Sequence, residues 1–86
     1  MRAPKRILIS ARILVGQTQE EIARGCGLGT KTVHRAEMGI AGIGTVETLM
    51  AFYERSGIRF IEPNESEGWG VTASFLTLPY EQERQD

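Results

Sequence analysis

Hydrophobic residues recur along this chain with two different periods, and the change falls near residue 57. Up to that point they are three or four positions apart, which is the spacing of one face of an α-helix. Beyond it they alternate with polar residues, as expected of strands with one buried face. The pattern therefore predicts a helical part followed by a short β-structure.

The segment KRILISARILV predicts a first helix over residues 5–15, with its apolar residues on one face. Pro4 suits the opening of a helix, and Gly16 would end it. In the next segment, TQEEIARGCG, Thr18 and Glu21 stand at the spacing of a capping box. A second, short helix is therefore expected after Thr18.

The other helix ends are predicted mainly from glycines. Gly27 would end the second helix, because glycine readily takes the left-handed conformation that follows a helix. The third helix, in GTKTVHRAEMG, would be capped at Gly29 and stop at Gly39. Thr45 is expected to cap a fourth helix, VETLMAFYERSG, that stops at Gly57. This gives four short helices within residues 1–57.

The segments IRFIE and GVTASFLTL alternate, and PNESEGWG between them is rich in turn-forming residues. We therefore expect a β-hairpin over residues 58–78. The tail PYEQERQD, residues 79–86, is polar and is expected to be disordered. The predicted fold class is mainly α, with four short helices that include a helix-turn-helix, followed by a C-terminal β-hairpin.

Length and composition limit the possibilities further. A chain of 86 residues forms one small domain of marginal stability. Cys26 is the only cysteine, which excludes an internal disulfide framework and a cysteine-rich zinc site. No apolar run approaches the roughly 20 residues that a membrane span needs. These features predict a cytoplasmic protein that does not enter a membrane.

The net charge of -1 hides an asymmetry between the two parts of the chain. Residues 1–39 carry seven basic and three acidic residues, a net charge of +4. Residues 40–86 carry three basic and eight acidic residues, a net charge of -5. A polyanion would therefore be bound by the first part, although an ordinary mixed surface would give the same count.

The stretch GCGLGTKTVHR, residues 25–35, has two possible interpretations, because its glycines precede Lys31. A phosphate-binding P-loop needs a strand before it and the dipeptide Gly-Lys, but Thr30 precedes the lysine and EEIARG has a helical pattern. The alternative is a tight turn between two helices, with Gly27 ending one and Gly29 capping the next. The sequence favours this helix-turn-helix, whose second helix enters the major groove of DNA by its first residues.

The segment QTQEEIARGCGLGTKTVHRAEMGIAGIGTVETLMAFYERSG resembles the helix-turn-helix domain of the Cro and phage-repressor (XRE-like) family. That family has a Thr-Gln-x-x-hydrophobic-Ala opening, a turn glycine, Thr-hydrophobic-x-x-hydrophobic-Glu-x-Gly, and a capped fourth helix. The resemblance covers roughly residues 5–57, and the hairpin resembles the extension of short, stand-alone members. The chain departs from the pattern at Cys26, Gly29 and Met38, and it lacks a proline before Thr45. The matching positions are Thr18, Gln19, Glu21, Ile22, Ala23, Gly27, Thr32, Val33, Arg35, Glu37, Gly39, Thr45 and Leu49.

The resemblance implies a DNA-binding surface and a salt bridge. Gln19 would contact a DNA phosphate at the start of the second helix, where free amides and the helix dipole favour anions. Arg12 and Glu37 occupy positions that often form a salt bridge between the first and third helices. The candidate DNA-binding residues are Thr18, which is expected first as a cap, Gln19, Thr30, Lys31, His34 and Arg35.

The chemistry of the third helix supports this hypothesis independently. Lys31 and Arg35 lie four positions apart on one face, and both can donate to guanine O6 and N7. Backbone amides of residues 40–44 could hold another phosphate. Lys31 and Arg35 could instead form an ordinary solvated face. His34, the only histidine, suits a surface or groove position better than a metal site, so we expect no metal and no cofactor.

The hairpin is a candidate dimer interface, because an isolated two-stranded hairpin is marginal in water and a small domain has little spare core. The strand edge can pair with a copy of itself, giving a two-fold dimer that closes at two. Trp69 is either a lid on the hairpin or an interface residue. The candidate interface residues are Ile58, Phe60, Ile61, Val71 and Phe75.

Together these features predict a sequence-specific DNA-binding regulator, a dimeric repressor that binds a palindromic operator through its third helix. No catalytic constellation is evident, so we expect no enzyme. Two alternatives stay open: an antitoxin-type regulator that also binds a partner protein, and a protein-interaction module that does not bind DNA.

Overall fold

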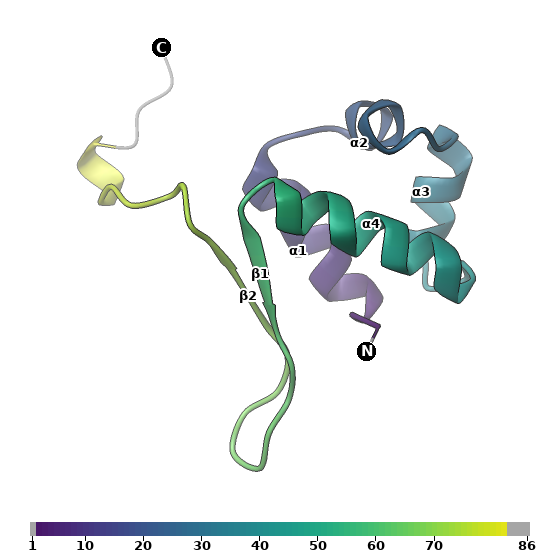
Figure 1. The fold of residues 1–86 in the computed structure, drawn as a ribbon. Helices are drawn as coiled ribbons and strands as arrows, with labels where there is room; N and C mark the ends of the chain where they lie inside the picture. The colour runs from purple at the N-terminus through teal and green to yellow at the C-terminus, as the bar shows by residue number, and fades with distance from the viewer. Residues whose placement is uncertain (1, 83–86) are drawn as a thin grey trace.

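The computed structural model describes residues 2–82 and contains four helices followed by a two-stranded antiparallel sheet (Figure 1). It confirms the mainly α fold with a C-terminal hairpin that the sequence predicted. In chain order the elements are α1 (Lys5–Val15), α2 (Gln19–Cys26), α3 (Thr30–Glu37), α4 (Ile43–Arg55), β1 (Ile58–Ile61), β2 (Gly70–Ala73) and the 3-10 turn η1 (Tyr80–Gln82).

Local sequence signals set the ends of the first three helices. The Thr18 hydroxyl accepts a hydrogen bond from the Glu21 amide at 3.1 Å, and the Glu21 carboxylate accepts one from the Thr18 amide at 2.9 Å. This is the predicted capping box at the start of α2. Gly16 and Gly27 follow α1 and α2 in the left-handed conformation, with φ of 79° and 71°. The helix-turn-helix is therefore formed by α2, a short turn at residues 27–29, and α3.

The start of α4 differs from the prediction that Thr45 caps it. The helix begins at Ile43, the N-cap is Gly42, and Thr45 lies within the first turn. The Val46 amide donates to the Gly42 carbonyl at 3.2 Å, which closes that turn. Gly42 takes the extended backbone of an N-cap without any side-chain hydrogen bond, so the helix starts three residues earlier than the threonine indicated.

The second strand is shorter than the predicted GVTASFLTL. It ends at Ala73, which pairs with Ile58, the first residue of β1. After Ala73 no strand residue is left to pair with. Ser74 still reaches the chain opposite, where its amide and its hydroxyl donate to the Gly57 carbonyl at 3.0 and 3.2 Å. Residues 74–82, which we call the arm, leave the sheet and run away from the helices (Figure 1).

The polar tail also departs from its prediction at one point. Within the stretch expected to be disordered, Tyr80–Gln82 form a single 3-10 turn, in which the Gln82 amide donates to the Pro79 carbonyl at 2.9 Å. The remainder of that predicted tail, residues 83–86, lies outside the part of the chain that the structure describes.

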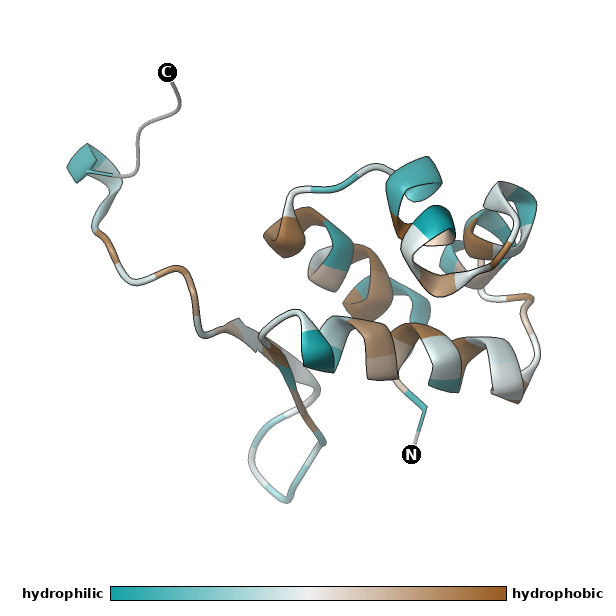
Figure 2. Cartoon of the chain, turned by 45° about the horizontal axis from the view of Figure 1, so that its top comes forward, coloured by the Kyte–Doolittle hydropathy of each residue, from teal (hydrophilic) through white to brown (hydrophobic). Residues whose placement is uncertain are grey.

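One core joins the four helices to the first strand. Its largest fully buried side chains belong to Tyr53, Leu8, Ile22, Leu49 and Val33. Figure 2 shows hydrophobic stretches on all four helices, and further hydrophobic stretches on the arm, away from the bundle. Burial of this shared core is the main force that holds such short helices together, because isolated helices of 8 to 13 residues are marginal in water.

The hairpin is attached to the side of the bundle formed by α1 and α4. Strand β1 packs against α4, and β2 packs against α1. The rings of Tyr53 and Phe60 meet edge to face at 6.4 Å between centroids. Trp69, just before β2, is half-buried and packs against the core. Figure 1 shows the sheet and the arm on the far side of the bundle from α3.

Candidate nucleic-acid interface

One side of α3 is fixed to the core and the other is open. Val33 is fully buried and Ala36 is 2% exposed, so these two residues anchor the helix. The structure brings four of the candidate DNA-binding residues together on the exposed surface of α3: Thr30, Lys31, His34 and Arg35. Because α3 is eight residues long, this exposed surface covers about two turns.

The polar side chains on this surface have no partners among residues 2–82. Among residues 2–82, Lys31, His34 and Arg35 form neither an ion pair nor a side-chain hydrogen bond. A charged group that is fully solvated and unpaired can bind an anion without first breaking an internal contact. The exposed surface of α3 therefore presents two free cationic side chains on one helix face.

A buried ion pair sets the position of α3. The Arg12 Nε donates to Glu37 Oε2 at 2.7 Å, and Arg12 Nη2 donates to Glu37 Oε1 at 3.1 Å. This is the pair that the family resemblance implied. The Glu37 side chain is 6% exposed and that of Arg12 is 20% exposed. The hydrogen bond to Glu37 raises the pKa of the Arg12 guanidinium, so the guanidinium stays charged.

Gln19 belongs to this same network. Its Nε2 donates to Glu37 Oε1 at 2.9 Å, while Arg12 Nη1 donates to the Gln17 carbonyl at 3.2 Å. The network therefore joins the end of α1, the start of α2 and the end of α3. The sequence assigned Gln19 a phosphate contact and missed this contact with Glu37, because nothing local in the sequence pairs residues 18 positions apart.

The start of α2 is a weaker anion site than the sequence implied. Thr18 is exposed and uses its hydroxyl as the cap, and Gln19 uses one amide proton on Glu37. Glu20 and Glu21 lie in the first turn, where their negative charges offset the positive end of the helix dipole. A phosphate held here would depend on the remaining amide proton of Gln19 and on backbone amides.

A second anion site is offered where α3 meets α4. A hollow of about 260 Å³ lies between them and is lined by Thr32, Arg35, Ile40, Ala41, Gly42 and Thr45. We call it the loop hollow. The first turn of α4 contains no acidic residue and no side-chain cap, so its leading amides have no partner within the helix. The sequence pointed to amides of residues 40–44 but missed Thr32 and Thr45, which join this site only through the packing of α3 against α4.

The candidate interface residues of the hairpin lie in different environments. Ile58 is 3% exposed in the chain's own core, and Phe60, Ile61 and Val71 are half-buried. Phe75 lies beyond β2 on the arm and is 46% exposed, with its ring close to the backbone of Gly57. The sheet therefore uses most of its apolar residues within the chain. The exposed large hydrophobic residues near it are those of the arm: Phe75, Leu76, Leu78 and Tyr80.

Comparison with known proteins identifies no relative from which a function could be inferred. No protein-family model matches this chain, and no curated protein is significantly similar to it in sequence. Within residues 2–82, no helix is long and apolar enough to cross a membrane. The same part of the chain contains no cluster of three or more His, Cys, Asp or Glu residues that could hold a metal ion.

Proposed function

We propose that this protein binds duplex DNA sequence-specifically through α3 and represses transcription as a dimer, in the manner of the Cro and phage-repressor family that its sequence resembles. One observation carries the proposal: Lys31, His34 and Arg35 are exposed and have no partner in the described part of the chain, on a helix whose opposite face packs into the core. The helix backbone that carries these donors is fixed before binding, so only their side chains have to be ordered on the DNA.

The dimensions and chemistry of α3 suit the major groove. That groove is about 12 Å wide and admits one α-helix. Arg35 can donate two hydrogen bonds to guanine O6 and N7, and Lys31 can donate to the same acceptors one turn away. Thr30, near the start of α3, is at the end that enters the groove first in this class of motif.

Phosphate contacts would set the orientation of α3 in the groove. The loop hollow would offer Thr32, Thr45 and the leading amides of α4 to one phosphate, while the Arg35 guanidinium at its edge reads the base. The start of α2 would supply Gln19 and Thr18 to another. Such contacts carry no sequence information, but they fix the register of the base-reading side chains.

Dimerisation would be provided by the hairpin and the arm. Each strand of a two-stranded sheet has one unpaired edge, and the arm exposes four large hydrophobic residues. A two-fold dimer binds two half-sites, so we expect a palindromic operator that the bound protein occludes. We therefore expect a cytoplasmic DNA-binding protein that needs no cofactor and is not an enzyme.

Selection of duplexes from a random pool by the purified protein tests this proposal. We expect enrichment of a palindrome whose half-sites are centred about 10 base pairs apart or a multiple of that spacing. An Arg35→Ala variant should lose preference at one base pair, whereas Arg59→Ala, an exposed arginine on β1, should select the parental sequence. A pool that remains random after repeated selection would count against DNA recognition.

The exposed arm also favours a second candidate, an antitoxin-type regulator whose arm binds a partner protein. Its apolar residues and Glu81 would fit an apolar groove with a basic rim. Purification of the protein from its native cells distinguishes the two, because a stoichiometric second chain is expected only for the antitoxin. Loss of that chain on changing Leu78 and Tyr80 to serine would assign the contact to the arm.

A further inference from the structure

A basic hollow lies between the start of the chain and the loop that follows α3. It has a volume of about 250 Å³, and its only charged lining residues are Arg2 and Lys5. Its floor is apolar and includes Leu8, Ala36 and Val46. We call it the N-terminal hollow. Both cationic side chains are exposed, and neither pairs with an acidic residue within residues 2–82.

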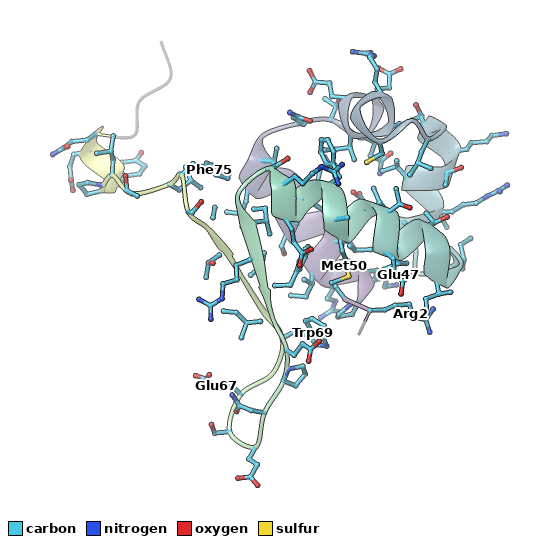
Figure 3. All side chains as sticks on the ribbon, in the orientation of Figure 1. Arg2, Glu47, Met50, Glu67, Trp69 and Phe75 are labelled. Carbon is cyan, nitrogen blue, oxygen red and sulfur yellow. The ribbon has the colours of Figure 1, made fainter. Side chains whose placement is uncertain are left out.

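The backbone segment that carries Arg2 is held in place by the packing of Ala3. Ala3 is 5% exposed, and its amide donates to the Met50 sulfur at 3.3 Å, which attaches the segment before α1 to α4. Figure 3 shows Arg2 projecting from this attached segment, near the start of α4. The segment is therefore a fixed support for Arg2.

Lys5 is brought to the loop after α3 by a close contact. Gly39 has a φ of 82°, and a Cβ added to it would stand 3.1 Å from Lys5 Cδ. The aliphatic stem of Lys5 thus packs directly on the backbone that turns from α3 toward α4. A side chain at position 39 would push this stem away, in addition to straining the left-handed backbone.

The N-terminal hollow and the loop hollow meet at one residue of the loop after α3. Ala41 lines both the N-terminal hollow and the loop hollow, and Arg35 lines the latter. Arg2, Lys5 and Arg35 therefore border one short loop, although Arg35 lies on α3 and the other two lie at or before the start of α1. DNA presents a continuous row of phosphates beside each groove, so a surface that extends along this loop meets more than one of them.

We propose that Arg2 and Lys5 form an additional phosphate clamp, which grips the DNA backbone next to the phosphate held by the loop hollow. The clamp rests on the proposed function, because it needs α3 to lie in the major groove. It adds affinity that does not depend on sequence, and it fixes the angle at which α1 and α3 approach the duplex. Neither the helix-turn-helix pattern nor the resemblance assigned these two residues a role.

The test is the salt dependence of binding by the full chain, measured by fluorescence anisotropy on the selected duplex between about 50 and 200 mM salt. Arg2→Gln and Lys5→Gln should each weaken binding to selected and scrambled duplexes alike. Each should also lower the slope of log K against log salt by about 0.9, and the double variant should lower it by about twice as much. Arg6→Gln is the matched control, since Arg6 is exposed on α1 but does not line the hollow.

The possible results separate this inference from the proposed function. Slopes for the Arg2 and Lys5 variants equal to those of the parent and of Arg6→Gln overturn the clamp but leave recognition by α3 intact. A parent that binds no duplex at any of these salt concentrations overturns both. Thermal melts of Arg2→Gln and Arg6→Gln should match the parent, because both side chains are exposed. The melt of Lys5→Gln measures what the packing of its stem on Gly39 adds to stability.

Discussion

The ring of Phe52 lies directly over Gly25, so a Cβ added at position 25 would stand 2.8 Å from the ring carbon Cε1. Helices α2 and α4 can approach this closely only because residue 25 has no side chain. Gly25 therefore serves the packing of two helices, although it lies inside α2, where glycine lowers helix stability.

Gly25→Ala should destabilise the protein despite the better helix propensity of alanine. Overpacking costs about 1–3 kcal/mol, and the gain in propensity offsets up to about 1 kcal/mol of this. We expect a net loss of about 1 kcal/mol in urea unfolding. Gly44→Ala is the control, since a Cβ there meets nothing within 4 Å, and it should be neutral or stabilising. Equal stability of the two variants would show that Phe52 moves aside without cost.

Removing the buried carboxylate of Glu37 should destabilise the protein more than Gly25→Ala does. Glu37→Gln leaves the Arg12 guanidinium mostly buried without a counter-charge, which should cost about 3 kcal/mol, the lower end for a broken buried pair. Glu54→Gln, at an exposed position of α4, should change stability by less than about 0.5 kcal/mol. Thermal melts of the two variants make the comparison. A Glu37→Gln melt that overlays the parent would mean that the pair adds nothing to the fold.

Tyr53 should make the fold sensitive to alkaline pH. Burial, and then the nearby Glu37 charge, raise the pKa of its phenol well above the usual value, although Arg12 opposes the shift. An unfolded tyrosine ionises near pH ~10, so above that pH the unfolded state loses a proton that the native state keeps. Stability is therefore retained below pH ~10 and falls above it by up to about 1.4 kcal/mol per pH unit.

Urea midpoints measured from about pH 9 to pH 11 test this. Tyr53→Phe should remove part of the alkaline decline, and Tyr80→Phe, at an 89% exposed position, should keep the parental profile. Identical profiles for the parent and Tyr53→Phe would show that another group causes the decline.

The arm should control assembly. Changing Leu76, Leu78 and Tyr80 together to serine removes exposed apolar surface without touching the core, so the variant should fold normally. Light scattering at micromolar concentration should find a dimer for the parent and a monomer for this variant. A variant that still dimerises would place the interface outside the arm. Truncation at Gly57 is a poorer test, since it removes Ile58 from the core.

Features set by neighbouring residues were predictable from the sequence. The capping box of Thr18 and Glu21 and the helix end at Gly27 depend on contacts within a few positions. The shared surface of Lys31 and Arg35 follows from the helical period alone. The start of α4 was less predictable, because Gly42 and Thr45 are both acceptable N-caps and only packing distinguishes them.

Features that depend on distant residues were not predictable. The end of β2 at Ala73 is fixed by where β1 begins, which the sequence of β2 does not contain. The bond from Gln19 to Glu37 and the two hollows that meet at Ala41 arise only when the helices pack. The sequence therefore predicted the candidate base-reading side chains of α3. The Gln19–Glu37 contact and the two hollows next to α3 became visible only in the tertiary structure.

The central claim is that α3 reads base pairs, and the most direct measurement compares two duplexes. Affinities of the parent for the selected duplex and for a scrambled duplex of equal composition are measured by fluorescence anisotropy at one salt concentration. We expect the parent to prefer the selected duplex by about 10³-fold or more. Arg35→Ala should lose about 1–3 kcal/mol of that preference, whereas Arg59→Ala should keep all of it. Equal affinity of the parent for both duplexes would contradict the claim.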